Sequence, residues 1–484
     1  MSLLIKNVQI VDGSGKKPYK GDILIQQEKI SAIGNLKSKQ TEKSIDGLGN
    51  YLIPAFVDPA ATSDRYLDIL VDPEQSRLKE QGIGTVIGGN GGISLAPLIY
   101  GRLDSLIKRW PDAAIANTDW HSMEEFFKSL RRFNLGVNFG SLAGYETVKE
   151  AVTGEENREL TRNEIKVAGK VIDNALKEGA FGVSINASYV SAAGRGEIKT
   201  ITDLVNKHHG FVSLSIDVKN GAERIKKIIG DFSGKHNKTK ILVTDFWPLV
   251  GHERVFEEVI SSASGNVRFS VKPYPGVIYE ALEILPSWIT KDRSRESAYK
   301  ALSEEDVAEK VKQELLWIDP EKALVLSSPN HEILRGKTIK ELSEMYGLPA
   351  ADTIIKIIKT CRLKFSFLYQ SANEEILLKH INDRNIFVSG YSDSRFAGLI
   401  MDKQAEKNSF TRAVEAAVES HSLPIEDAVK SVSSAPAKFL NIKNRGVVKE
   451  GYAADLVIID KDNFKTTYSI VGGLIGGTPL RHGW

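Results

Sequence analysis

The chain has 484 residues, of which 42% are hydrophobic and 26% are charged, a composition typical of globular proteins. Its 64 basic and 62 acidic residues leave a formal net charge of +2, so the charge balance favours neither a nucleic-acid nor a membrane partner. No stretch approaches the roughly 20 apolar residues of a membrane helix. The single cysteine, Cys361, excludes an intrachain disulfide and a cysteine-rich metal cluster. It lies in the apolar-periodic stretch IIKTCRLKF, where we interpret it as a packing residue. Together with the lack of a signal-peptide pattern, it predicts a cytoplasmic protein.

The two ends of the chain carry similar strand patterns. Two period-2 runs, LLIKNVQIVDG and GDILIQQEKISAIG, open the sequence, with the turn-rich DGSGKKPYKG between them. A matching run, GVVKEGYAADLVIID, occupies 446–460. We therefore predict one small β-sandwich domain built from 1–54 and 441–484.

The middle of the chain alternates strand-like and helix-like segments. Amphipathic helices such as 161–179, which ends at Gly179, separate most of the short apolar runs. Eight strands with helical crossovers indicate parallel pairing, and eight strands close a barrel. We predict an α/β fold, a distorted TIM-type (β/α)8 barrel over 55–440, with an inserted subdomain over 290–348. The eight apolar runs lie at 51–58, 84–89, 136–144, 180–186, 211–217, 240–246, 267–274 and 386–393.

Chemistry in such a barrel is expected at the carboxyl ends of the strands. None of the nine histidines falls at any of these eight ends, although His252 follows the sixth strand closely enough to reach the barrel mouth. A zinc site needs converging imidazoles, thiolates or carboxylates. We therefore predict no protein-bound transition metal and no cofactor.

Carboxylates do fall at or just beyond the strand ends. Their oxygens would favour a weakly bound Mg²⁺ or Ca²⁺, whereas the structural alternative is that they cap helices or form Asx turns. Nucleotide-binding motifs fail on spacing, since GIGTVIGGNGG has Ile87 at the third glycine position and HEILRGKT has His331 at the first. No serine nucleophile elbow is present. The carboxylates concerned are Asp58, Asp217, Asp245 and Asp393.

Several segments carry a resemblance to a known family. IKNVQIVDGSGKKPYKGDILIQQEKISAIG, LIPAFVD, GIGTVIGGNGGISLAPL, NFGSLAGYETVK, ALKEGAFGVSINASYVSAAG, GKTIKELSEMYGLPAADTI and NRGVVKEGYAADLVIID together span nearly the whole chain. With them the chain resembles the amidohydrolase superfamily, specifically its D-aminoacylase, or N-acyl-D-amino-acid deacylase, branch. The resemblance implies hydrolysis of non-peptide C–N bonds at a metal centre.

The residues that the resemblance places at the metal centre are unusual for that purpose. The family's His-x-His pair falls on Ala60 and Thr62, and its ligand cysteine falls on Gly91. Three further ligand histidines correspond to Tyr145, Leu214 and Asp245, and a substrate-binding lysine corresponds to Trp247. The family's catalytic aspartate corresponds to Asp393. The resemblance thus implies the scaffold without its metal ligands.

We therefore weigh three hypotheses. The first is a non-catalytic member of this fold that binds a small-molecule ligand or acts in assembly, and a homo-oligomer is compatible with the fold. The second is a working C–N hydrolase of N-acyl-D-amino acids with a rebuilt centre using Asp245, Asp393 and His252. The third is decay of a fold still held together by its core.

The hypotheses share one set of candidate site residues. Asp393 and Asp245 are the catalytic candidates, and Tyr145, Trp247 and Tyr274 are the substrate-binding candidates. If Leu214, Trp247 and Tyr145 point inward, they should pack over Ala60 and Gly91 and shrink the pocket. In that case Trp247 acts as a plug, whereas in an open pocket it would be a stacking platform.

Overall fold

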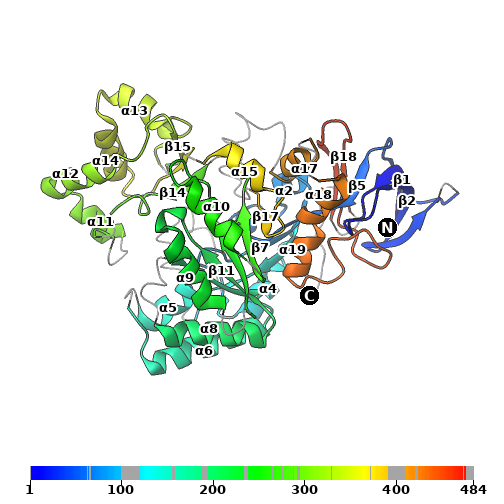
Figure 1. The fold of residues 1–484 in the computed structure, drawn as a ribbon, viewed down its shortest axis with the longest axis horizontal. Coiled ribbons are helices and arrows are strands. Elements are labelled where there is room, and N and C mark those ends of the chain that lie inside the picture. Colours follow the sequence, from blue (N-terminus) through cyan, green and yellow to red (C-terminus); the bar gives the residue numbers. More distant parts are fainter. Residues whose placement is uncertain are drawn as a thin grey trace.

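The fold is taken from a computed structural model of the chain (Figure 1). No helix within the described ranges has the length and apolar character needed to cross a bilayer. The structure describes residues 2–36, 38–62, 64, 67–99, 120–154, 158–187, 194–233, 238–263, 265–273, 276–286, 288–290, 295–328, 330–370, 372–390, 409–419, 423–471 and 474–475.

The two ends of the chain meet in one eight-stranded sheet, as the period-2 runs predict. Its order is β20-β19-β18-β5-β1-β2-β3, and β4 pairs with β1. The contact between the ends is the antiparallel ladder of β5 with β18, in which Leu52 pairs with Ile458. Alternate residues such as Leu3, Ile5 and Ile23 bury one face. The strands are β1 (Ser2–Ile10), β2 (Tyr19–Gln26), β3 (Lys29–Gly34), β4 (Lys43–Asp46), β5 (Tyr51–Pro54), β18 (Leu456–Ile459), β19 (Thr466–Val471) and β20 (Leu474–Ile475).

Parallel strands run through the middle of the molecule at the eight places that the sequence predicts. They form the ladders β6-β7-β8 and β9-β10-β11-β12-β13-β17. Only Leu142 separates β8 from β9, and its N–H donates to the Gly88 carbonyl at 3.0 Å, so the two ladders follow one another. The strands are β6 (Phe56–Asp58), β7 (Ile83–Gly88), β8 (Asn138–Ser141), β9 (Ala143–Gly144), β10 (Gly182–Asn186), β11 (Phe211–Ser215), β12 (Lys240–Thr244), β13 (Val267–Val271) and β17 (Ile386–Val388).

Helices cover the outside of these strands. The helix over Arg162–Lys177 illustrates how the sequence sets the start of a helix. Thr161 and Glu164 form a reciprocal capping box at its N-terminus. Its apolar face, including Ile172 and Leu176, packs toward the strands. The covering helices include α5 (Tyr145–Thr153), α6 (Arg162–Lys177), α8 (Arg195–Lys207), α9 (Ala222–Ser233), α10 (Glu253–Ser262), α15 (Glu374–His380), α17 (Ser409–Glu419) and α18 (Ile425–Val432).

Two separate apolar clusters give the direction of the strand side chains. The larger cluster joins strands to the helix layer, and on β11 it contains Val212 and Leu214. A smaller cluster fills the inside of the barrel and contains Phe211 of the same strand. Phe439 of the short helix α19 (Ser434–Phe439) packs on Phe211 at 5.6 Å between ring centroids. Since successive strand residues point to opposite sides, Ser213 and Ser215 lie on the inner side with Phe211.

The inserted segment has a core of its own. Its antiparallel strands are β14 (Val277–Glu280), β15 (Ala323–Ser327) and β16 (Ser366–Tyr369), which carry the helices α11 (Arg295–Ala301), α12 (Glu305–Glu314), α13 (Ile339–Tyr346) and α14 (Ala350–Thr360). In Figure 1 these helices project on the side opposite the terminal sheet. The core begins before and ends after the predicted 290–348, because β14 and β16 pair beside β15. Cys361 lies buried in it, and burial raises the pKa of its thiol to about 11. The limits predicted for the β-sandwich domain (1–54 and 441–484) and for the barrel (55–440) remain predictions.

Candidate functional site

Hydroxyl side chains line the inner barrel wall near the carboxyl ends of the strands. Ser213 donates to the Asn90 side-chain oxygen at 2.8 Å, and Ser215 donates to the Asp245 carboxylate at 2.6 Å. Ser270 and Ser389, on β13 and just after β17, share a hydrogen bond of 2.5 Å. On β10, Ser184 donates to the Gly89 carbonyl and accepts from the Gly92 N–H. These hydroxyls are therefore engaged with one another and with the surrounding loops.

A small cavity lies at this end of the barrel. Its volume is about 20 Å³, which is close to the space needed by one water molecule. Two of its lining side chains carry buried polar atoms with no hydrogen-bond partner in the described structure, Thr244 Oγ1 and Trp247 Nε1. The lining residues are Ala60, Ala61, Thr62, Asp64, Asn90, Gly91, Thr244, Asp245, Trp247, Ser270 and Lys272.

Trp247 is buried beside this cavity. Its side chain is only 5% exposed and belongs to the larger apolar cluster. It lines the cavity together with Ala60 and Gly91. This arrangement agrees with the plug and not with an exposed stacking platform.

Leu214 and Tyr145 do not pack over Ala60 and Gly91, as inward-pointing side chains would. Leu214 points outward into the helix layer, because Phe211, Ser213 and Ser215 occupy the inner positions of β11. Tyr145 opens helix α5, and its hydroxyl donates to the Glu197 carboxylate on α8. Neither residue lines the cavity.

Tyr145 instead belongs to a buried polar cluster between helices α5 and α8. Lys149 Nζ lies 3.3 Å from Glu197 Oε2, and both side chains are 1% exposed. The other Glu197 oxygen accepts from the Leu160 N–H at 2.9 Å and the Gly194 N–H at 3.1 Å. Burial raises the pKa of Glu197, and these backbone hydrogen bonds act in the opposite direction. The cluster holds the two helices and the intervening chain together.

Two of the strand-end aspartates, Asp58 and Asp217, stabilise tight turns. Asp58 accepts from the Ala60 N–H at 3.0 Å, and Asp217 accepts from the Lys219 N–H at 2.8 Å, both over two residues as in an Asx turn. Asp245 adopts a left-handed backbone (φ 57°) and is exposed. Asp393 and Tyr274 lie outside the described residues.

A second group of titratable side chains connects the barrel mouth to the inserted segment. Lys219 Nζ lies 4.1 Å from the centroid of the Trp317 ring and donates to the Tyr279 hydroxyl at 3.2 Å. Burial raises the pKa of Asp217, as does the nearby charge of Asp245, while Lys219 and His252 lower it. Burial also lowers the pKa of Lys219 and raises that of Tyr279.

The described donors at the barrel centre do not fit a zinc ion. Zinc sites use imidazole, thiolate or carboxylate ligands in converging sets. Here the inner wall offers neutral hydroxyls already engaged in hydrogen bonds, and Lys272 adds a positive charge. The two carboxylates that line the cavity, Asp64 and Asp245, accept from the Gly89 N–H and the Ser215 hydroxyl, and no imidazole or thiolate lies beside them in the lining. Gly91 has φ 74°, which strains any residue bearing a ligand side chain. Within the described ranges, no group of three His, Cys, Asp or Glu could hold a metal ion.

Sequence reasoning missed the inward hydroxyls Ser213, Ser215, Ser270 and Ser389. Every residue of β11 is buried, so a contrast between buried and exposed positions does not separate its inner from its outer side chains. The usable signal is the repeated Ser in FVSLS, at the strand's alternate positions.

Comparisons with known proteins agree with this architecture. The model of the Amidohydrolase family matches residues 325–480. An N-acyl-D-aspartate deacylase of Alcaligenes xylosoxydans xylosoxydans is 24% identical over 477 residues, covering 96% of this chain and 86% of that protein. An N-acyl-D-glutamate deacylase of the same organism is 22% identical over 478 residues, covering 96% and 88%.

Solved structures show the same fold. The N-acyl-D-glutamate deacylase of Bordetella bronchiseptica, in complex with zinc and a phosphonate inhibitor, aligns with a TM-score of 0.77 at 18% identity. A D-aminoacylase aligns with a TM-score of 0.72, also at 18% identity. Each alignment covers 98% of this chain and 96% of the other. The resemblance to the amidohydrolase superfamily and its D-aminoacylase branch is confirmed.

Proposed function

We propose that this chain, which resembles the N-acyl-D-amino-acid deacylases in sequence and fold, is a non-catalytic member that acts as a ligand-binding or assembly protein. The proposal rests on what fills the barrel centre. Engaged hydroxyls, a buried tryptophan and a cavity of about 20 Å³ occupy the place where the resemblance puts a metal and a substrate. Pockets for drug-sized ligands typically have volumes of about 300 to 1,000 Å³.

The chemistry of water supports the same proposal. A bound metal ion lowers the pKa of a coordinated water from about 15.7 toward 7 and so supplies hydroxide at neutral pH. A carboxylate alone is too weak a base for neutral water. Asp245 is exposed, and its carboxylate already accepts a hydrogen bond from the Ser215 hydroxyl.

A second candidate, a hydrolase with a rebuilt centre, is favoured by one observation. Asp217 is a half-buried carboxyl with a raised pKa beside Asp245, Lys219 and His252 at the barrel mouth. A carboxyl with a raised pKa is a better general base than an ordinary one. In this candidate Asp217 and Asp245 would work with Asp393.

Turnover distinguishes the two candidates. The purified chain should be assayed with N-acetyl-D-glutamate, N-acetyl-D-aspartate and N-acetyl-D-leucine, with and without added zinc, next to an active deacylase as the positive control. The proposal predicts no release of acetate above the rate without protein. Turnover that disappears in both Asp217→Asn and Asp245→Asn would establish the rebuilt centre instead.

A further inference from the structure

A large cavity lies at the end of the barrel opposite the candidate site. Its volume is about 830 Å³, within the range of about 300 to 1,000 Å³ typical of ligand pockets. Val137, Asn138 and Phe181, at the amino ends of β8 and β10, line it. It therefore shares no lining residue with the small cavity at the carboxyl ends of the strands. We call this the basal cavity.

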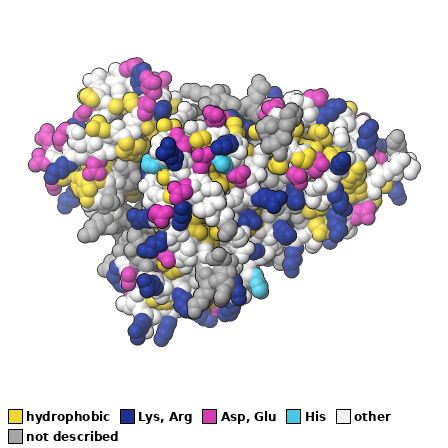
Figure 2. Space-filling model, viewed as in Figure 1, with side chains coloured by type: hydrophobic (Ala, Val, Ile, Leu, Met, Phe, Trp, Pro, Cys, Tyr) yellow, Lys and Arg dark blue, Asp and Glu magenta, His cyan; other side chains and the backbone are white. Residues whose placement is uncertain are grey.

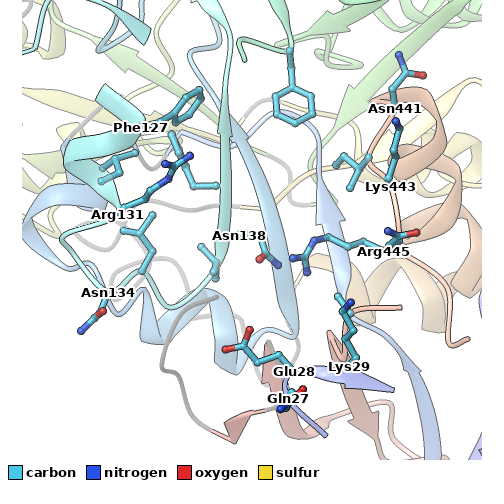
Figure 3. Close-up of a pocket in the computed structure, with 18 of the residues that line it drawn as sticks. Gln27, Glu28, Lys29, Phe127, Arg131, Asn134, Asn138, Asn441, Lys443 and Arg445 are labelled. Carbon is cyan, nitrogen blue, oxygen red and sulfur yellow. The ribbon is translucent and has the colours of Figure 1, made fainter. Parts of the chain in front are cut away.

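Four segments that are distant in the sequence build the basal cavity (Figure 3). They are the β2–β3 turn at 27–29, the end of helix α4 (Met123–Leu130) with the chain after it, the strand starts, and 441–453. Hydrogen bonds fix these walls: Ala454 N–H donates to the Glu28 carbonyl at 2.9 Å, and Asn441 donates to the His209 carbonyl at 2.7 Å. Binding would thus require little ordering of the walls.

The floor of the cavity is apolar. Leu130, Val137, Phe139, Phe181 and Ile442 line it from three of the four segments. Burying a chain or ring against such a surface contributes roughly 25 cal/mol per Å² of apolar area. The floor alone would accept a neutral ligand as readily as a charged one.

The charges around the floor select the ligand. Four cationic side chains line the cavity, Lys29, Arg131, Lys443 and Arg445, against one carboxylate, Glu28. Arg445 pairs with Asp455, which also accepts from Asn138 at 3.0 Å, so that arginine is part of the wall. Within the part of the chain that the structure describes, Lys29, Arg131 and Lys443 form no salt bridge. Three cations from three different walls are therefore available to an anion.

We propose that the basal cavity is a binding site for a small organic anion that carries an apolar chain or ring. The apolar part lies on the floor, and the positive charge of Arg131, Lys29 and Lys443 around it attracts the carboxylate or phosphate. On the face shown in Figure 2, by comparison, acidic and basic side chains are interspersed. The site is independent of whether the barrel centre is catalytic.

Fluorescence titration with 8-anilinonaphthalene-1-sulfonate, an aromatic anion, tests the proposal on the full chain. The probe should bind saturably, and decanoate or decyl phosphate should displace it at concentrations at least about tenfold lower than uncharged decanol, since one charge-assisted hydrogen bond is worth about that factor. The relative strengths of decanoate and decyl phosphate distinguish a carboxylate from a phosphate ligand.

Two matched pairs of variants locate the site. Arg131→Glu and Lys443→Glu change lining residues, whereas Arg132→Glu and Lys449→Glu change exposed neighbours that do not line the cavity. The lining variants should weaken the probe about tenfold or more, and the controls should stay within about twofold. Thermal unfolding midpoints, expected to be unchanged, verify that the variants fold. Equal weakening in both pairs, displacement by decanol as effective as by decanoate, or unsaturable probe binding would overturn the proposal.

Discussion

The Asp58 carboxylate accepts a hydrogen bond from the Gly390 N–H at 2.9 Å, although the two residues are 332 positions apart. Asp58 ends β6, and Gly390 follows β17, the first and last strands of the barrel. Among the described residues no backbone ladder joins these two strands. The Asp58 side chain therefore supplies the connection that a backbone ladder provides between other neighbouring strands. Its second carboxylate oxygen accepts from the Ala60 N–H.

Removing this carboxylate should destabilise the fold. In Asp58→Ala two buried N–H groups lose their acceptor, and each unsatisfied group costs about 1 to 3 kcal/mol. We expect a loss of about 2 to 5 kcal/mol in the free energy of unfolding, measured by urea denaturation. Asp46 is the control, because its carboxylate also accepts from a backbone N–H but is exposed, so Asp46→Ala should lose less than about 1 kcal/mol. Equal losses in both variants would show that Asp58 makes no special contribution.

The same residue should make stability depend on pH. Burial raises the pKa of Asp58, against the opposing effects of its backbone hydrogen bonds and Lys272. The folded chain therefore keeps a proton that the unfolded chain releases above its ordinary pKa of about 3.9. This contribution is fully present below that pKa and is lost as pH rises through the raised one. Unfolding free energies measured upward from about pH 4 should fall in the wild type relative to Asp58→Asn. Parallel curves would contradict the assignment.

Trp247 should contribute strongly to stability. Because its side chain is 5% exposed, Trp247→Ala should lower the free energy of unfolding by about 3 to 5 kcal/mol. Trp288 offers a matched control, since it is 47% exposed and Trp288→Ala should lose far less. Trp247→Phe keeps the ring packing and removes the unpartnered indole N–H, so we expect it to recover most of the loss. If Trp247→Ala were as stable as Trp288→Ala, the tryptophan would not be a plug.

The buried pair Lys149–Glu197 yields a further prediction. Lys149→Met leaves the Glu197 carboxylate buried without its cation and should lose about 3 to 5 kcal/mol. Adding Glu197→Gln removes the buried charge and should restore part of that loss, as a double-mutant cycle would measure. In contrast, Lys177 is half exposed in its salt bridge with Asp173, so Lys177→Met should lose less than about 1 kcal/mol. A Lys149→Met loss no greater than that of Lys177→Met would rule out the stabilising role of the buried pair.

Sequence patterns predicted the strand order and the meeting of the two ends because strand periodicity and crossover rules are local signals. The direction of side chains inside the barrel was harder to predict. In β11 all five residues are buried, so burial does not separate the outward Leu214 from the inward positions, and only the alternating Ser213 and Ser215 mark the register. Asp58 was recognised as a strand-end carboxylate with an Asx turn as the structural alternative, and that turn is present. Its second partner, Gly390, depends on tertiary closure that no local pattern contains.

The basal cavity could not be predicted for a similar reason. Its cations, such as Lys29, Arg131 and Lys443, come from segments that approach one another only when the terminal sheet packs beneath the barrel. In the sequence each is one lysine or arginine among 64 basic residues.

The measurement that tests the central claim most directly is the zinc content of the purified full chain. The chain should be incubated with excess zinc, passed over a desalting column and analysed by elemental mass spectrometry, next to an active D-aminoacylase treated in the same way. Because the described barrel centre offers engaged hydroxyls, an ammonium group and only two carboxylates, Asp64 and Asp245, we predict that this chain retains only traces while the control retains its metal. One zinc per chain that survives desalting and is lost in Asp245→Ala would contradict a barrel centre without a metal site.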